Sequence, residues 1–188
     1  MVVGILALQG AFAEHGHMLD MLEVEHFEIR QKRDLEKKFD ALILPGGEST
    51  VIGKLMIESE LLEPIRKCIE SGMPVMGTCA GLILLAKEVE ANRTYLGTMD
   101  IQVKRNAYGR QLGSFCTKQE VKGLGEVPMV FIRAPYIMNV GENVEILAVV
   151  DGRIVAARQG KQLAVAFHPE LTEDVRVYRY FLNMIEKS

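Results

Sequence analysis

Apolar runs alternate with segments of helical periodicity over roughly the first half of the chain. Each apolar run is short, is bounded by turn residues and is followed by a stretch with apolar positions three or four apart. These patterns predict strands at 2–8, 26–30, 41–44 and 74–77, and helical segments at 12–23, from 45–50 to about 71, and at 80–87. The alternation is typical of a mostly parallel sheet covered by helices on both faces.

From about residue 97 the pattern changes to shorter alternating segments separated by glycine-rich turns. This pattern predicts strands at 101–104, 114–121, 129–132, 144–150, 153–158 and 162–167, which suits an antiparallel extension of the sheet. A final helix is predicted at 173–187, capped by Thr172. The fold class is therefore α/β, a three-layer open sheet. Without an internal repeat or a linker, residues 1–188 are expected to form a single domain.

Composition disfavours some classes of binding partner and some kinds of cysteine site. The 188 residues are 48% hydrophobic and 25% charged, and the net charge of −3 disfavours binding to nucleic acid or to an anionic membrane. The first residues lack the charged start of a signal peptide, and no apolar run is long enough to cross a membrane, so a cytoplasmic location is expected. Three widely spaced cysteines, Cys68, Cys79 and Cys116, indicate neither a disulfide framework nor a metal site.

Cys79 lies in the most informative segment, Gly77-Thr78-Cys79-Ala80-Gly81, between a predicted strand and a predicted helix. Small residues on either side of a nucleophile permit the strained turn that exposes its side chain, and a helix start favours the thiolate. A buried packing cysteine at such a junction is about equally plausible on the motif alone.

A histidine and a carboxylate follow the last predicted strand, in Phe167-His168-Pro169-Glu170. Proline favours an extended backbone at His168, which would place His168 and Glu170 on the same side of the chain. A carboxylate that orients an imidazole leaves the other ring nitrogen free to take a proton from a thiol. In isolation, His168 as a strand end and Glu170 as a solvated charge would be the simpler interpretation, but the cysteine turn favours catalysis.

The segment Pro45-Gly46-Gly47-Glu48-Ser49 follows another buried strand. Its glycines allow backbone N–H groups to face an oxyanion, together with the N–H of Ala80, and Glu48 offers a carboxylate to a substrate ammonium. A tight turn with Ser49 as helix cap is the structural alternative, and both interpretations are compatible. No Gly-Lys-Ser/Thr follows, so the segment is not a phosphate-binding loop.

These three motifs, in this order and spacing, resemble the triad-type glutamine amidotransferases, and further motifs resemble their subgroup of pyridoxal phosphate synthase glutaminases. The resemblance spans essentially the whole chain. Its other motifs are Leu8-Gln9-Gly10-Ala11 with Glu14-His15, Arg105-Asn106-Ala107-Tyr108-Gly109-Arg110-Gln111, Phe131-Ile132-Arg133-Ala134-Pro135, and the extension of His168-Pro169-Glu170 to Asp174. Ala107-Tyr108 is a mild variation on the family pattern. The resemblance implies a flavodoxin-like, class I glutamine amidotransferase fold.

The resemblance also implies residue roles. Cys79 would form a glutamyl thioester, His168 would act as general base and then acid, and Glu170 would orient the imidazole. Glutamine-binding positions are Gly47, Glu48, Ser49, Arg105, Ile132 and Arg133, and the oxyanion and switch loop comprises Gln9, Gly10, Gly46, Gly47 and Ala80. An acidic and a basic side chain beside the nucleophile also suit a zwitterionic substrate, although without the resemblance Arg105 and Arg133 would equally be surface charges.

A partner is implied as well, because ammonia released into water would be protonated and lost. The family passes ammonia from L-glutamine to a barrel-fold synthase that makes pyridoxal 5'-phosphate from a pentose phosphate and a triose phosphate. The two proteins form a large ring-shaped hetero-oligomer with one glutaminase per synthase subunit. Neither a cofactor nor a metal is expected on this chain.

Three alternatives stay open. The glutaminase subunit of imidazole glycerol phosphate synthase shares the cysteine turn and the His-Pro-Glu segment but lacks the motifs around Arg105 and Arg133. A cysteine peptidase or stress protein would carry a histidine beside the cysteine, where this chain has Ala80. A regulatory subunit with a vestigial site would be expected to lose part of the triad. His15, His17 and His26 are interpreted as structural, with a minor possibility that His15 helps to position the Gln9 loop or the partner surface.

Overall fold

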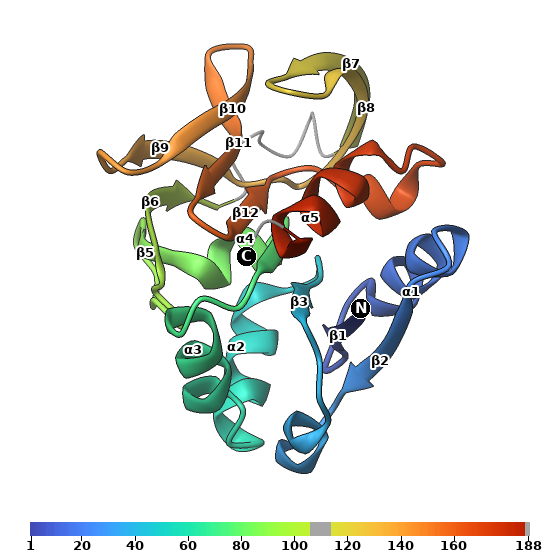
Figure 1. The fold of residues 1–188 in the computed structure, drawn as a ribbon. Helices are drawn as coiled ribbons and strands as arrows, with labels where there is room; N and C mark the ends of the chain where they lie inside the picture. Colours follow the sequence, from blue (N-terminus) through green and yellow to red (C-terminus); the bar gives the residue numbers. More distant parts are fainter. Residues whose placement is uncertain (106–113, 187–188) are drawn as a thin grey trace.

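The computed structural model describes residues 1–105 and 114–186, and its elements form three layers with a sheet in the middle (Figure 1). The first half contains β1 (Val2–Leu6), α1 (Phe12–Met21), β2 (Glu25–Ile29), η1 (Lys32–Glu36), β3 (Ala41–Leu44), α2 (Ser49–Glu58), α3 (Leu62–Glu70), β4 (Val75–Thr78) and α4 (Ala80–Leu85). The second half contains β5 (Ala86–Val89), β6 (Met99–Lys104), β7 (Ser114–Val121), β8 (Gly125–Ile132), β9 (Tyr136–Val140), β10 (Glu145–Val150), β11 (Arg153–Gln159), β12 (Gln162–Val165), η3 (Pro169–Leu171) and α5 (Arg176–Glu186).

The parallel half of the sheet has the strand order β2-β1-β3-β4-β12. This is the order of flavodoxin-like folds, with β12 as the fifth parallel strand, and it confirms the predicted fold class. Ligands bind such sheets at the carboxyl ends of the strands, near the point where the strand order reverses. Here that point lies between β1 and β3.

The antiparallel extension predicted from the second half is also confirmed. β11 pairs antiparallel with β12, and β9, β6 and β5 continue the same sheet beyond it. β10 forms a hairpin with β11, while β7 and β8 form a separate two-stranded sheet.

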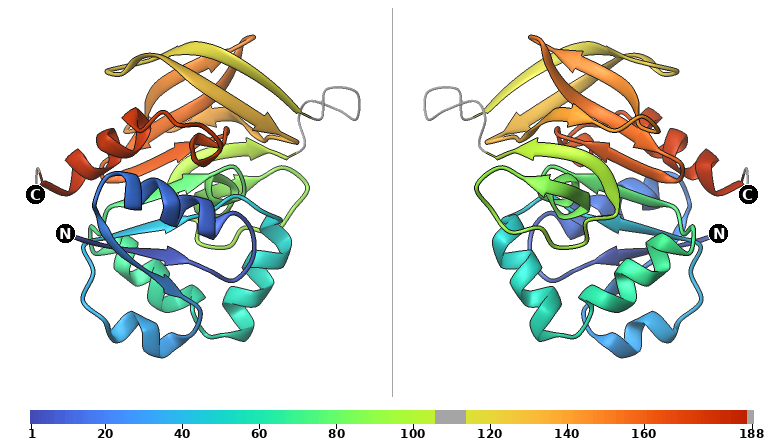
Figure 2. Two further views of the ribbon diagram at one scale, coloured as in Figure 1. Left: turned by 90° about the vertical axis from the view of Figure 1, so that its right-hand side faces the viewer. Right: turned by 90° about the vertical axis from the view of Figure 1, so that its left-hand side faces the viewer.

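Helices cover both faces of the parallel half. Figure 2 shows α1 and α5 together on one face and α2 and α3 on the other. This follows from right-handed crossovers, because the chain moves toward opposite edges of the sheet after β1 and after β3. α1 and α5 are linked on this face by a buried hydrogen bond between the side chains of His15 and Tyr178.

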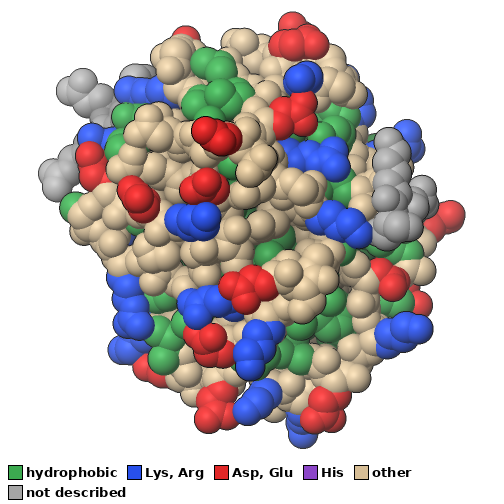
Figure 3. All heavy atoms as spheres, turned by 60° about the vertical axis from the view of Figure 1, so that its left-hand side comes forward, with side chains coloured by type: hydrophobic (Ala, Val, Ile, Leu, Met, Phe, Trp, Pro, Cys, Tyr) green, Lys and Arg blue, Asp and Glu red, His purple; other side chains and the backbone are tan. Residues whose placement is uncertain are grey.

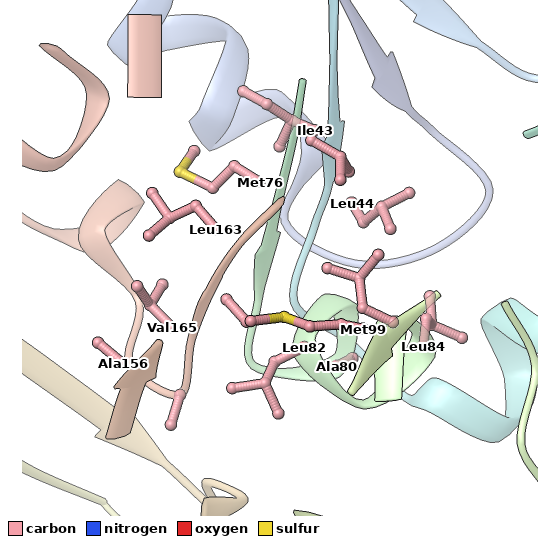
Figure 4. Close-up of a cluster of buried hydrophobic side chains, with 14 of the residues drawn as sticks. Ile43, Leu44, Met76, Ala80, Leu82, Leu84, Met99, Ala156, Leu163 and Val165 are labelled. Carbon is pink, nitrogen blue, oxygen red and sulfur yellow. The ribbon is translucent and has the colours of Figure 1, made fainter. Parts of the chain in front are cut away.

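The core consists of fully buried aliphatic side chains on both faces of the sheet. Every residue of β3 and β4 is buried, as expected for strands covered on both faces. Figure 4 shows part of this core, with side chains from β3, β4, α4, β6, β11 and β12: Ile43, Leu44, Met76, Ala80, Leu82, Leu84, Met99, Ala156, Leu163 and Val165.

Glycines bring the backbone of α4 unusually close to the sheet. A Cβ atom at Gly81 would overlap the backbone carbonyl of Leu44, and one at Gly77 would lie 2.6 Å from the carbonyl carbon of Gly81. Any side chain at these two positions would push α4 away from β3 and β4. The two glycines of the cysteine motif therefore set the depth at which the following helix packs.

Several helix boundaries differ from the prediction. The region from 49 to 71 is two helices, α2 and α3, separated by a turn in which Glu60 takes a φ of 57°. The helix after Cys79 ends at Leu85, and the last helix begins at Arg176 without a cap from Thr172. The Thr172 hydroxyl instead accepts a hydrogen bond from the backbone N–H of Asp174, at 3.2 Å.

Two strands and two short 3-10 helices, η1 and η3, were not predicted. Residues 86–89 continue an apolar helical pattern in the sequence, but they pair with β6 as strand β5, so long-range pairing overrides local preference. β9 and the 3-10 helix η1 were also missed, because each is short and only partly buried. Residues 106–111 of the Arg105 motif and Lys187 of the predicted last helix lie outside the described residues.

Charges of both signs are mixed over the surface, as Figure 3 shows for one face. Within 1–105 and 114–186, no helix combines the length and the apolar character needed to cross a membrane.

Gly81→Ala should destabilise the fold, because the added methyl group meets the rigid backbone of Leu44. We expect the free energy of unfolding to fall by about 2 to 3 kcal/mol, measured by denaturant unfolding. Gly16→Ala in α1 is the matched control, since its nearest neighbour is the Cε1 atom of the half-buried His26 side chain, at 3.1 Å. A gain in helix propensity should hold that change within about 1 kcal/mol. Equal effects of the two substitutions would contradict this account of the packing.

Candidate active site

Loops that follow β1, β3, β4 and β12 meet at one edge of the sheet. Strand register sets this convergence, since Leu44 of β3 lies opposite Gly77, and Thr78 of β4 lies opposite Val165 of β12. The loops open onto a cavity of about 250 Å³. Its lining consists of Gln9, Gly47, Glu48, Ser49, Cys79, Ile83, Arg105, Ile132, Arg133 and His168.

Cys79 stands in a strained turn between β4 and α4. Its φ of 48° and ψ of −99° are rare for a residue with a side chain, and strain of this kind is held in place at functional sites by the surrounding structure. Here the Cys79 N–H donates to the carbonyl of Val165 at 2.8 Å, and Gly81 packs the helix onto β3. The side chain is 7% exposed and faces the cavity, so the predicted nucleophile turn is present in the fold.

His168 and Glu170 form a buried pair at the end of β12. The Nδ1 atom of His168 lies 2.6 Å from Oε1 of Glu170, and the backbone N–H of His168 donates to the carbonyl of Val130 at 2.8 Å. The predicted pairing is present, but its geometric reason was wrong. Glu170 lies in the 3-10 turn η3, so its carboxylate folds back to the imidazole instead of projecting from an extended segment.

The charges of this pair support each other. Burial opposes an imidazolium, but hydrogen bonds to the Cys79 side chain and to Glu170 outweigh it and raise the pKa of His168 to about 10. Burial likewise opposes a carboxylate, yet the hydrogen bond from His168 and the positive charge of its ring lower the pKa of Glu170. His168 therefore lies between the Cys79 side chain and Glu170, and its imidazole holds a proton.

Two loops are locked together beside the cysteine. The side-chain oxygen of Gln9 accepts a hydrogen bond from the Glu48 N–H at 2.8 Å, and the Ala11 N–H donates to the carbonyl of Gly46 at 3.0 Å. Glycine is required for this contact, because a Cβ at Gly10, whose φ is 102°, would overlap the Gly46 carbonyl oxygen. A Cβ at Gly46 would lie 2.5 Å from Cε1 of His168.

Glu48 and Arg105 both line the cavity, where their side chains form an ion pair. The Nη2 atom of Arg105 donates to Oε1 of Glu48 at 2.5 Å, and Nη1 donates to Oδ1 of Asn92 at 2.9 Å. The acidic and basic groups expected to receive the ammonium and the carboxylate of a zwitterionic substrate thus neutralise each other. Such a pair can be exchanged for contacts with an ammonium and a carboxylate of the substrate.

The remaining predicted residues also lie at this edge of the sheet. The Ile132 carbonyl is 4.0 Å from the Cys79 sulfur, Arg133 is exposed with a φ of 43°, and Ser49 is buried at the start of α2 without capping it. Ala80 is buried directly after the cysteine.

The sequence analysis did not assign two features to the site. One is Ile83, which lines the cavity, and the other is a group of buried polar side chains next to Glu170. That group includes His15, whose Nε2 atom lies 3.8 Å from Oε2 of Glu170. The sequence analysis interprets His15 as structural and gives no sign of this neighbour. His17 is exposed, and His26 is hydrogen-bonded to Asp20 at 3.0 Å. Cys68 is half-buried, and Cys116 is exposed.

Comparison with known proteins gives concordant results. Residues 5–187 match the model of the SNO glutamine amidotransferase family. The chain is 58% identical, over the full length of both chains, to the pyridoxal 5'-phosphate synthase subunit PdxT of Streptococcus pneumoniae serotype 2 strain D39 and to that of strain 70585. A solved structure described as a glutamine amidotransferase is 50% identical, with a TM-score of 0.94 over 99% of this chain and 100% of the other. A putative GMP synthase protein from Thermoplasma acidophilum shares the fold, at 18% identity and a TM-score of 0.70 over 100% of this chain and 94% of the other.

Glu170→Gln should lower the pKa of His168, because it removes the negative charge at Oε1. We expect the wild-type imidazole to stay protonated up to about pH 10 and the variant to lose its proton nearer the ordinary value of 6.5. NMR titration of labelled histidines measures this, with His168→Gln to assign the signal. Glu173→Gln, an equal change of charge at an exposed position nearby, should leave the titration unchanged. An unaltered pKa in Glu170→Gln would refute the assigned pairing.

Proposed function

The chain belongs to the SNO glutamine amidotransferase family, and we propose that it hydrolyses L-glutamine to glutamate and ammonia as the glutaminase subunit of a pyridoxal 5'-phosphate synthase. The observation that carries this proposal is the chain of Cys79, His168 and Glu170 in a cavity that also presents Glu48 and Arg105. A thiol nucleophile with its acid–base partner suits attack on an amide carbon.

In the first half of the reaction, the Cys79 thiolate attacks the side-chain amide carbon of glutamine. A C–S bond forms, and the carbonyl π electrons move onto oxygen to give a tetrahedral oxyanion. When the oxyanion collapses, the C–N bond breaks and the imidazolium of His168 donates its proton to the leaving nitrogen, releasing ammonia. Glu170 holds the imidazole in the required tautomer throughout. The product on the enzyme is a glutamyl thioester.

In the second half, water attacks the thioester while the now neutral His168 accepts one of its protons. Collapse of the second tetrahedral intermediate breaks the C–S bond and frees glutamate. The thiolate and the imidazolium are restored together, so the enzyme returns to the ion pair from which it began. The raised pKa of His168 suits this resting state, because it keeps the proton needed for the amine on the ring at neutral pH.

Glutamine recognition is assigned to the cavity wall. Glu48 would receive the substrate ammonium and Arg105, with the Ile132-Arg133 segment, would receive its carboxylate, while Gly47 and Ser49 line the wall beside them. The cavity of about 250 Å³ is smaller than pockets for drug-sized ligands, which suits a single amino acid. Binding would replace the Glu48–Arg105 ion pair by two ion pairs with the substrate.

The loop of Gln9 and Gly10 is proposed as a switch. In the structure the Glu48 N–H donates to the side chain of Gln9, and the Ala11 N–H donates to the Gly46 carbonyl, so both groups of the loop after β3 are engaged. Docking of a partner against this loop would release the Gly46-Gly47 backbone to complete an oxyanion site with the Ala80 N–H. Hydrolysis by the free protein would then be slow.

The partner proposed is the barrel-fold synthase that uses a pentose phosphate, a triose phosphate and the released ammonia. Relatives that are 58% identical over their full length carry the description of pyridoxal 5'-phosphate synthase subunits, which supports this partner. We propose a ring-shaped hetero-oligomer with one glutaminase per synthase subunit, working in the cytoplasm. The 58% sequence identity to these relatives also disfavours the three alternative interpretations, namely a subunit of imidazole glycerol phosphate synthase, a cysteine peptidase or stress protein, and a regulatory subunit with a vestigial site.

Glutamate release should be slow for the chain alone and should rise at least about tenfold when the pyridoxal phosphate synthase partner is added, because the partner completes the oxyanion site. A coupled glutamate dehydrogenase assay measures this. Cys79→Ala, with the synthase present, should release no glutamate, whereas Cys116→Ala should retain full activity. The barrel protein of an imidazole glycerol phosphate synthase serves as the control partner. Stimulation by that control alone, or an active Cys79→Ala variant, would overturn the proposal.

A further inference from the structure

A buried polar group lies directly behind Glu170, on the side away from the cavity. It consists of His15 from α1, Tyr178 from α5 and Thr78 from the end of β4, and all three are 0% exposed. Three elements far apart in the sequence thus place hydrogen-bonding side chains in the core at one point. The mechanism above uses none of them, and polar side chains in a core are costly unless each is paired.

Hydrogen bonds tie this group together and fix its protons. The Nδ1 atom of His15 is 2.6 Å from the Tyr178 hydroxyl, and Nε2 is 3.1 Å from the Thr78 hydroxyl. Burial lowers the pKa of His15, so the ring is neutral and carries a single proton. Burial and the nearby Glu170 raise the pKa of Tyr178, so its hydroxyl keeps its proton and is able to donate to Nδ1. His15 then carries its own proton on Nε2.

That Nε2–H donates to the Thr78 hydroxyl, 3.1 Å away, and the same edge of the ring lies near the carboxylate of Glu170. Oε1 of Glu170 bonds to His168, but Oε2 is buried and has no hydrogen-bond partner within the described residues. Nε2 of His15 lies 3.8 Å from this orphaned oxygen. The opposite tautomer would turn a lone pair toward the carboxylate, which is unfavourable in a buried site. Tyr178 therefore selects the tautomer whose positive edge faces Glu170.

We propose that His15, held by Tyr178, is a positioning residue that keeps Glu170 ionised and aimed at His168. The proposal rests on the glutaminase function given above. Outer partners of this kind fix the orientation and charge of the groups that touch the reacting atoms, and in metal sites their loss costs 10 to 100-fold. The ionisable groups that face His15 are Glu14 of its own helix, Glu170 and His168 of the segment after β12, and Tyr178 of α5.

Four variants, measured with the synthase present, separate positioning from mere packing. His15→Leu removes the donor, and we expect kcat to fall at least about tenfold with KM little changed. His15→Gln restores an amide N–H near the position of Nε2 and should recover part of that loss. Tyr178→Phe frees the tautomer and should lower kcat to a smaller extent. Tyr95→Phe is the matched control, because it removes a buried hydroxyl that donates to Thr50 at 3.3 Å, away from this group.

The pH profile of kcat provides a second readout. Without the donor, Glu170 accepts a proton at a higher pH. The midpoint of the acid limb should therefore shift to higher pH in His15→Leu and Tyr178→Phe and stay unchanged in Tyr95→Phe. Thermal unfolding of every variant controls for loss of fold. If His15→Leu does not fold, His15→Gln and Tyr178→Phe carry the test.

Alkylation of Cys79 by iodoacetamide, followed on its peptide by mass spectrometry, is a readout that needs no glutamine. Its pH profile should shift in His15→Leu and Tyr178→Phe and not in Tyr95→Phe. Wild-type kcat and unshifted profiles in folded His15 and Tyr178 variants would overturn the proposal, as would equal losses in Tyr178→Phe and Tyr95→Phe. The proposed function can fail separately. If the alkylation shifts appear as expected but the wild-type protein hydrolyses no glutamine with its synthase, the proposed function is refuted and the positioning role of His15 is retained.

Discussion

The close approach of α4 to β3 is the constraint on which the site depends. Because Gly81 rests on the backbone of Leu44, the helix begins immediately after β4, and Cys79 is held at a φ that the chain would otherwise avoid. The same packing brings the loop after β3 beside the cysteine, where Gly46 leaves just enough room for the imidazole of His168. The proposed nucleophile, the proposed base and the proposed backbone donors are thus placed by the sheet, and little remains for flexible side chains to arrange.

A buried carboxylate is the second feature that organises the molecule. Glu170 is 5% exposed, and an isolated charge there would be strongly unfavourable. It is stabilised by His168 in front and faces His15 behind, so the acid of the proposed triad is connected to α1 and α5 as well as to the cavity. α1 starts directly after the Gln9 loop, and this places both the front and the back of the site on one short segment of chain.

Sequence patterns predicted the parallel half of the fold well, because its strands are continuous apolar runs and its loops carry glycines with a steric purpose. The pairing of Cys79 with His168 followed from strand ends meeting at one edge of a sheet. β5 was missed because its pairing with β6 overrides the local helical preference, and β9 was missed because it is short and only partly buried. Glu170 was paired correctly although the turn η3, not an extended chain, brings it to His168. His15 was read as structural because its role depends on Tyr178 and Glu170, more than 150 positions away.

The central claim is that Cys79 carries the substrate as a covalent thioester. Rapid acid quenching during glutamine turnover in the complex with the synthase, followed by mass spectrometry of proteolytic peptides, tests it most directly. The account predicts that the peptide containing Cys79 gains the mass of one glutamyl group, and that the adduct is absent without glutamine and in Cys79→Ala. Glutamate release with no adduct on Cys79, or with an adduct on another residue, would contradict it.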